Sequence, residues 1–196
     1  MVMAGTDPAP TTAASEFAEL ERLWQQFEPT RDARVELIDG EIIVSPSGSV
    51  PHSATIDRLM DQLVDVKRQH RWLFHTWLTV HIPATRERMI PDLMVAPDDA
   101  PQFGNDELLA PGVLLVTEVV SWWSRRRDRE VKLRAYAQGE VPLYLMIDRF
   151  ADPAAVTLFS EPGQDGYAQR RAARAGEPLR LPEPFGVDLD TARLLG

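Results

Sequence analysis

The sequence contains no cysteine, and only two of its 21 basic residues are lysines, Lys67 and Lys132. The absence of cysteine excludes disulfide bonds, thiolate catalysis and zinc–thiolate sites, and it suits a reducing compartment. No apolar run approaches the roughly 20 residues that a membrane helix needs. The N-terminus also lacks the basic stretch and apolar core of a secretory signal. We therefore expect a cytoplasmic protein that has no membrane partner.

Positive charge is scarce as well, since the net charge is −9 at pH 7. Proteins that coat nucleic acid bind by neutralising phosphates, so this balance argues against such a coat. It leaves room for an enzyme that meets nucleic acid through one local basic face. With 196 residues, 44% of them hydrophobic and 26% charged, the chain suits a single globular domain with a sizeable core.

Composition and periodicity divide the chain into a leader and one domain. Residues 1–14 are rich in alanine, threonine and proline and lack periodicity, which predicts a disordered leader. Residues 15–196 are expected to form the domain, with its core at about 34–160. Apolar residues at helical spacing predict one helix from Ser15 to Pro29 and another from Ser53 to His70.

Most of the other segments have the patterns of strands and turns. In order, we expect a hairpin over 34–45, one long alternating strand over 72–82, a surface loop over 97–112, and a hairpin over 156–171 followed by a polar tail. The first hairpin turns at Asp39-Gly40, a strong two-residue turn signal.

The segment from Val113 to Asp148 organises the rest of the chain. Two apolar runs, 113–116 and 143–147, flank an arginine-rich helical pattern that ends at Gly139. Such runs are typical of strands buried on both faces, and the segment between them is long enough to connect parallel neighbours. A further short strand runs from Ile90 to Val95. The order of elements predicts a mixed sheet in an α/β to α+β domain.

Asp92 and Glu118 are the candidate metal ligands. Glu118 lies in the apolar string VLLVTEVV, where a carboxylate must find a cation or shift its pKa. The simpler alternatives are a buried salt bridge for Glu118 and a turn-capping role for Asp92. On adjacent strands, however, two carboxylates and water would form an octahedral site for Mg²⁺ or Mn²⁺. Such an ion stabilises charge at a scissile phosphate and lowers the pKa of bound water.

Lys132 is the candidate catalytic cation. It lies four residues after Asp128, so an exposed helical ion pair is the ordinary interpretation. Elsewhere the chain uses arginine almost exclusively as its cation. A lysine on the helix after Glu118 therefore favours a need for a compact ammonium that orients water or meets a phosphate.

Three consecutive arginines, Arg125, Arg126 and Arg127, are the candidate nucleic-acid contact. Such a run is usually a solvated helix face, but in an acidic protein it can also be the local phosphate contact. The neighbouring Trp122 and Trp123 belong either to the core or to the rim of a site.

His52, Glu36 and Glu41 complete the candidates. His52 follows Pro51 near a helix start and is either a surface histidine or a catalytic base. Glu36 and Glu41 are out of phase with the apolar residues of their hairpin, so we expect them to face solvent. Only tertiary contacts could bring one of them to a metal.

Together these motifs resemble the Uma2 family, bacterial proteins of PD-(D/E)XK nuclease fold that are assigned as restriction-type endonucleases. The resemblance rests on Val35 to Glu41, Ser45-Pro46, Pro51-His52, Pro91-Asp92, Glu118 to Ser121, Arg127-Asp128, Lys132-Leu133, Tyr136-Ala137, Gly139, Val141-Pro142, Tyr144 and Asp148.

The resemblance implies an αβββαβ restriction-endonuclease core with an added N-terminal helix, a β-hairpin and a C-terminal hairpin. It makes Asp92 and Glu118 the metal-binding acids, and places the lysine on the next helix as Lys132. Glu41 or Glu36 would be an additional acid, with His52 nearby. Where relatives usually have Ser-Pro-Ser-Thr after the glutamate, this chain has Ser-Trp-Trp-Ser over residues 121–124.

The expected activity is hydrolysis of nucleic-acid phosphodiester bonds, with DNA favoured and Mg²⁺ or Mn²⁺ as cofactor. A homodimer is compatible with this interpretation. Two alternatives stay open at this point. One is a catalytically silent binding or assembly module that retains the fold, and the other is a purely structural ion pair between Glu118 and Lys132.

Overall fold

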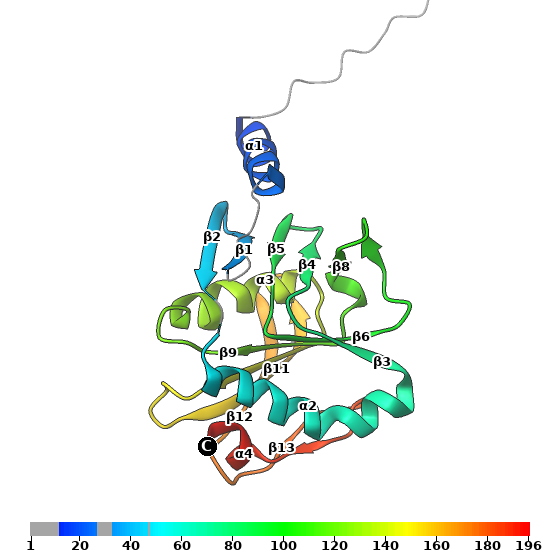
Figure 1. Cartoon of the computed structure of the whole chain (residues 1–196), viewed down its shortest axis with the longest axis vertical. Helices are drawn as coiled ribbons and strands as arrows, with labels where there is room; N and C mark the ends of the chain where they lie inside the picture. The colour runs from blue at the N-terminus through cyan, green and yellow to red at the C-terminus, as the bar shows by residue number, and fades with distance from the viewer. Residues whose placement is uncertain (1–11, 27–32, 47) are drawn as a thin grey trace, which may run out of the picture.

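Most of the strands form two six-stranded mixed sheets, with helix α3 between them (Figure 1). The computed structural model describes residues 12–26, 33–46 and 48–196. The α-helices in these ranges are α1 (Thr12–Gln26), α2 (Val50–His70), α3 (Lys132–Gln138) and α4 (Thr191–Leu195). Among them none is both long and apolar enough to cross a membrane. The expected mixture of helices and mixed sheets is confirmed.

The central sheet has the order β12-β11-β10-β9-β6-β3. Its strands are β3 (Trp72–His75), β6 (Leu93–Pro97), β9 (Leu115–Val119), β10 (Leu143–Asp148), β11 (Ala155–Gly163) and β12 (Gly166–Ala173). β9 and β10 are parallel, with Glu118 opposite Met146. A π-helical segment, η2 (Arg127–Val131), and α3 connect them. The predicted strand–helix–strand unit is therefore present.

Both faces of this sheet are covered, which explains why β9 and β10 are apolar along most of their length. Alternate residues enter two separate cores: Leu143 and Leu145 pack toward α2, whereas Tyr144 and Met146 pack toward α3. Every residue of β9 and β10 is buried. A continuous apolar run is the pattern required of a strand that has no solvent-facing side.

The second sheet lies on the far side of α3 and has the order β2-β1-β5-β4-β8-β7. Its strands are β1 (Ala33–Ile38), β2 (Glu41–Pro46), β4 (Thr79–Ile82), β5 (Glu87–Met89), β7 (Gln102–Phe103) and β8 (Glu107–Leu109). The predicted hairpin is β1–β2. Asp39 and Gly40 have φ angles of 51° and 74°, as a two-residue hairpin turn requires.

The long strand predicted over 72–82 is wrong, because the chain divides there into β3 and β4, which belong to different sheets. Trp77, with φ 63°, lies at the division. The apolar alternation continues across it, but Trp72 enters the core beneath α2 and Val80 enters the core beside α3. The apolar alternation therefore belongs to two strands, each of which contributes side chains to a different hydrophobic core.

The surface loop predicted over 97–112 also contains structure: β7, β8 and a 3₁₀ turn, η1 (Ala110–Gly112). β8 pairs in parallel with β4, and its Glu107 is buried against Arg88. Gly139, which ends α3, lies close by. A Cβ added there would lie 3.0 Å from Ala110 and 3.1 Å from Ile82, so a larger residue would force these neighbours to shift.

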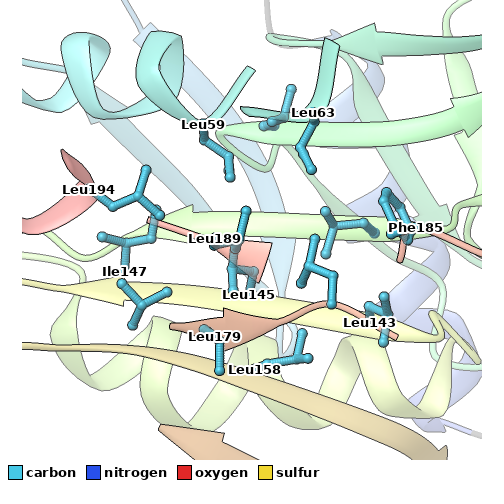
Figure 2. Close-up of a cluster of buried hydrophobic side chains, with 14 of the residues drawn as sticks. Leu59, Leu63, Leu143, Leu145, Ile147, Leu158, Leu179, Phe185, Leu189 and Leu194 are labelled. Carbon is cyan, nitrogen blue, oxygen red and sulfur yellow. The ribbon is translucent and has the colours of Figure 1, made fainter. Parts of the chain in front are cut away.

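The C-terminal segment follows residues 34–160, the stretch expected to contain the core of the domain. It nevertheless packs into the hydrophobic cluster beneath α2. Figure 2 shows Leu179, Phe185, Leu189 and Leu194 in one cluster with the leucines and isoleucine of β10. The backbone of this segment forms a small sheet of β13 (Leu179–Arg180) and β14 (Asp188–Leu189), followed by α4. The predicted C-terminal hairpin is present as β11–β12.

The two predicted helices are present as α1 and α2. The end expected for the first, at Phe27 to Pro29, lies outside the described residues, as do residues 1–11 of the predicted leader. Residues 12–14 belong to α1. α1 contacts β1, where Trp24 Nε1 donates a hydrogen bond to the Val35 carbonyl at 3.3 Å.

Candidate active site

Glu118 is placed by the alternation of β9. Val116 and Val120 enter the core on the α3 face of the central sheet, so Glu118, which lies between them in the same phase, points toward α3 as well. Its side chain is 3% exposed. Oε1 accepts hydrogen bonds from Lys132 Nζ at 2.9 Å and from Tyr136 Oη at 2.8 Å. Within the described part of the chain, Oε2 makes no hydrogen bond.

Asp92 lies beside Glu118, directly before β6. The register of Leu93 opposite Thr117 brings Asp92 opposite Glu118 on the same face of the antiparallel pair. The carboxylate is 4% exposed and accepts a hydrogen bond from the backbone N–H of Val119 at 2.8 Å. The two predicted acids are therefore neighbours on adjacent strands, as the resemblance implied.

Lys132 is not the exposed helical cation of the ordinary interpretation. It is 4% exposed, and its Nζ lies 2.9 Å from Glu118 Oε1 and 2.9 Å from Glu36 Oε1. An ammonium has three donors. Two are used by these carboxylates, and among the described residues the third has no further partner, so it can meet a molecule in the cavity that Lys132 lines.

Glu36, expected to face solvent, is 3% exposed. Ile38, which has the same phase as Glu36 along β1, belongs to the core beside α3, so the phase of a single hairpin did not reveal that this face is buried. The carboxylate bridges Lys132 and the backbone N–H of Ile90, which donates to Oε1 at 2.9 Å. It thereby holds the lysine and the segment that leads to Asp92.

Two further basic side chains face Asp92. Arg34 of β1 makes a very short ion pair with Oδ1, and His52 Nε2 lies 3.0 Å from the same oxygen. Arg34 Nε is buried and has no hydrogen-bond partner among the described residues. Arg34 was missed from the sequence, where one arginine among many carries no distinguishing signal.

Gly48 sets the position of His52. A Cβ added at Gly48 would lie 2.7 Å from Cδ2 of the imidazole, a separation that real Cβ atoms do not adopt. Glycine thus allows the ring to lie over the backbone and reach Asp92. His52 is held at the site, with 16% of its side chain exposed, and is not a surface histidine.

The π-helical turn η2 brings a fourth acid to the site. Asp128 is 2% exposed and accepts a very short hydrogen bond from Ser124 Oγ. Tyr144 Oη of β10 donates to the Asp128 carbonyl at 2.9 Å, which anchors the turn to the sheet. π-Helical turns are rare and occur often at functional sites. Here the turn places Asp128 and Lys132 side by side facing the acids.

The surroundings displace the protonation equilibria of the acids in opposite directions. Burial alone would raise the pKa of Asp92, but His52, Arg34 and the Val119 N–H lower it to about 2. Burial raises the pKa of Glu118 to about 8, against the effect of Lys132 and with repulsion from Asp92, Asp128 and Glu36. Near neutral pH, one acid is fully ionised and its neighbour retains a proton.

The other two buried ionisable groups respond to the same crowding. Burial also raises the pKa of Asp128, to about 6, although Lys132 and Ser124 oppose the shift. Burial alone would lower the pKa of Lys132, but Glu118, Glu36 and Asp128 raise it above its ordinary value. Lys132 therefore stays charged throughout the range in which the acids titrate.

The acids lie at the floor of a cavity of about 880 Å³. Its walls include Arg34, His52 and Lys132, and its outer part includes the aromatic side chains Trp122, Trp123 and Phe150. This volume is within the range typical of small-molecule sites. A second cavity, of about 750 Å³, contains none of the candidate residues.

The donor chemistry fits a divalent ion that prefers oxygen. In the described part of the chain, no three acidic or histidine side chains converge closely enough to hold an ion by themselves. Two do lie together, Asp92 and Glu118, and Glu118 Oε2 carries no hydrogen bond. Mg²⁺ is commonly held by one or two carboxylates, with water and substrate phosphate completing the shell. The described site contains four buried acids, Asp92, Glu118, Glu36 and Asp128, and two permanently charged cations, Arg34 and Lys132. This excess of acids over cations also favours the binding of a positive ion.

The remaining candidates lie farther out. Glu41 is exposed beside the Asp39-Gly40 turn and does not line the cavity. Of the arginine run, Arg127 lines the cavity, whereas Arg126 is a largely exposed partner of Glu130. Arg125 stacks on Trp122, with its Cζ 3.5 Å from the ring centroid.

Comparison with known proteins identifies a family and a related fold. The model of the Uma2 family, described as "Putative restriction endonuclease", matches residues 14–192. Among curated proteins, no significant match was found. A solved structure described as "a putative nuclease belonging to DUF820", from Anabaena variabilis, is 17% identical, with a TM-score of 0.68 over 90% of this chain and 96% of that one. At this identity the likeness shows a shared nuclease-like fold.

Proposed function

Since the chain belongs to the Uma2 family, we propose that it is a Mg²⁺- or Mn²⁺-dependent nuclease that hydrolyses phosphodiester bonds of DNA. The observation that carries the proposal is the pairing of Asp92 and Glu118 at the floor of a cavity that also contains Lys132. The arrangement combines oxygen ligands for a metal with cations for a phosphate. A structural ion pair alone would require neither the second acid nor the cavity.

Asp92 and Glu118 would hold the metal ion. When bound, the ion stabilises negative charge on the scissile phosphate and lowers the pKa of a coordinated water. Lys132 has one donor left beyond its two carboxylate partners, and with it would orient the attacking water toward phosphorus. Glu36 keeps the ammonium in this position through its 2.9 Å contact.

Arg34 and His52 would bind the phosphate. Arg34 Nε is a buried donor without a partner among the described residues, and the side chains of Arg34 and His52 both line the cavity. Phosphate oxygens are suitable acceptors for both groups. Water attack then breaks the bond between phosphorus and the leaving oxygen, which must take up a proton. The cations of the site stabilise the charge that develops on the phosphate.

The test is a cleavage assay on plasmid and single-stranded DNA with Mg²⁺ or Mn²⁺. Asp92→Asn should abolish cleavage, whereas Asp98→Asn should not, because Asp98 lies at the other end of β6 and is 46% exposed. Binding of Mn²⁺ measured by calorimetry should be lost in Asp92→Asn and in Glu118→Gln. If both variants bind Mn²⁺ as the parent does, the metal assignment is wrong. Metal binding without cleavage would instead favour a silent binding module.

A further inference from the structure

Three aromatic side chains, Trp122, Trp123 and Phe150, form an exposed rim at the mouth of the cavity. Their exposed fractions are 59%, 84% and 46%. Tryptophan is usually well buried, and exposed apolar patches mark interaction sites. All three line the cavity that contains Asp92 and Glu118. The aromatic rim is therefore continuous with the candidate catalytic floor.

Specific contacts hold part of this rim in place. The Trp122 ring lies edge-on to Phe150, with 6.1 Å between centroids, and carries the Arg125 guanidinium at 3.5 Å on its face. Arg125 Nε also donates to the Trp122 carbonyl at 3.3 Å. Trp123, in contrast, has no ring or cation contact in the described part of the chain. Its indole faces are thus available to another ring.

The charge around the rim favours a nucleic acid over an apolar peptide. Arg127 and Arg149 line the same cavity, and Arg125 covers Trp122. These cations are concentrated here although the protein as a whole carries a net charge of −9. Aromatic platforms interleaved with arginine are how proteins bind single strands, where bases stack on rings and phosphates meet cations.

The depth of the acids distinguishes unpaired from paired nucleotides. Asp92 and Glu118 are only 4% and 3% exposed, so a scissile phosphate must enter the cavity and pass the rim to reach them. In a duplex, the faces of the bases are occupied by stacking on one another. Only an unpaired or extruded nucleotide has a free face to place against an indole.

We infer that the cavity receives a single-stranded segment, with the base next to the scissile phosphate stacked on Trp122 or Trp123. This inference rests on the proposed nuclease function for the position of the phosphate. The rim then selects unpaired nucleotides, and duplex DNA would be a substrate only where it opens or frays.

The experiment compares binding of two probes in EDTA, so that metal-dependent cleavage does not interfere. The probes are a labelled oligothymidylate of about 15 nucleotides, close to the upper site size of single-strand binders, and a duplex hairpin of the same length. The proteins are the parent, the double variant Trp122→Ala/Trp123→Ala, and Trp123→Phe. Phe103→Ala is the control, because Phe103 is a 48% exposed aromatic residue that lies outside the cavity.

The parent should prefer the single strand, and the double variant should lose roughly 5- to 150-fold in affinity for it per stacked base. Affinity for the hairpin should stay unchanged, and Trp123→Phe should keep most of the single-strand affinity because it retains a ring. An equal loss for both probes, no loss, or a parent that binds neither probe would overturn the inference. The inference would also be overturned if the double variant changed from oligomer to monomer with no effect on DNA binding. That result would identify the rim as a self-association surface.

The two proposals can fail separately. If the parent cleaves DNA but the tryptophan variants bind both probes normally, the rim assignment falls and the nuclease proposal stands. If the single-strand preference depends on the tryptophans but no metal supports cleavage, the rim stands and hydrolysis falls.

Discussion

Replacing Lys132 by methionine removes the one cation that, among the described residues, directly contacts both Glu118 and Glu36. Both contacts measure 2.9 Å, and all three side chains are at most 5% exposed. Removing one partner of a buried ion pair costs about 3–5 kcal/mol, because the remaining charge is left unpaired. Glu118, whose pKa is raised to about 8, already retains a proton near neutral pH, so it loses less than a fully ionised partner would when the lysine is removed. We therefore expect a loss near the lower limit, about 3 kcal/mol.

For a chain of this size, a loss of about 3 kcal/mol lowers the melting temperature by about 6–12 °C. Thermal unfolding in EDTA, followed by circular dichroism, measures it. The control is Lys67→Met, the same change at the only other lysine of the sequence. Lys67 is half-buried and lies 4.7 Å from the Phe74 ring centroid, a contact worth about 0.5–1 kcal/mol.

The comparison between the two lysines decides the result. If Lys132→Met and Lys67→Met melt within a degree or two of each other, Lys132 is not held between two carboxylates, and its role in the site falls with that contact. Cleavage by Lys132→Met at the parental rate would remove it from the mechanism even if its structural role stands.

Two other predictions concern the position of His52 beside Asp92 and the contact of Arg127 with DNA. Gly48→Ala should displace the His52 imidazole, since the added Cβ would lie 2.7 Å from it, and should lower the cleavage rate about 10- to 100-fold with little change in melting temperature. Gly163→Ala is the control, because a Cβ added there would lie 3.6 Å from its nearest neighbour, the Gly166 carbonyl oxygen. If both variants cleave at the parental rate, His52 has no role in the site. Arg127→Gln should lower the slope of log affinity against log salt by about 0.7–0.9, the value of one phosphate contact. If Arg71→Gln, at an 83% exposed site, lowers the slope equally, net charge is responsible and not a contact.

Much of the central sheet could be predicted from the sequence because its strands are buried on both faces. A strand with no solvent-facing side must be apolar throughout, so β9 and β10 were evident as continuous runs. The same requirement made Glu118 conspicuous, since a carboxylate in such a run needs a cation or a raised pKa. The structure shows both, with Lys132 as the cation.

The second sheet could not be predicted in the same way. Apart from the predicted hairpin β1–β2, its strands are short, and β5 has only three residues. Their burial depends on contacts with α1 and α3, which are distant from most of them in the sequence. A period of two indicates which residues share a face but not whether a distant helix covers that face. For this reason Glu36 was expected in solvent, and the segment 72–82 was expected to be one strand.

The sequence by itself determined the metal-ligand candidates, the lysine that follows them and the strand–helix–strand unit that carries them, because each is a local departure from a strong pattern. Only the tertiary structure decided which other charges join them. Arg34 and Asp92 are 58 positions apart, and Glu36 and Ile90 are 54 apart. Contacts over such separations depend on how two sheets pack around α3. The physical reason is that a buried charge can be recognised from its apolar neighbours along the chain, whereas the partner that makes its burial tolerable is selected in three dimensions.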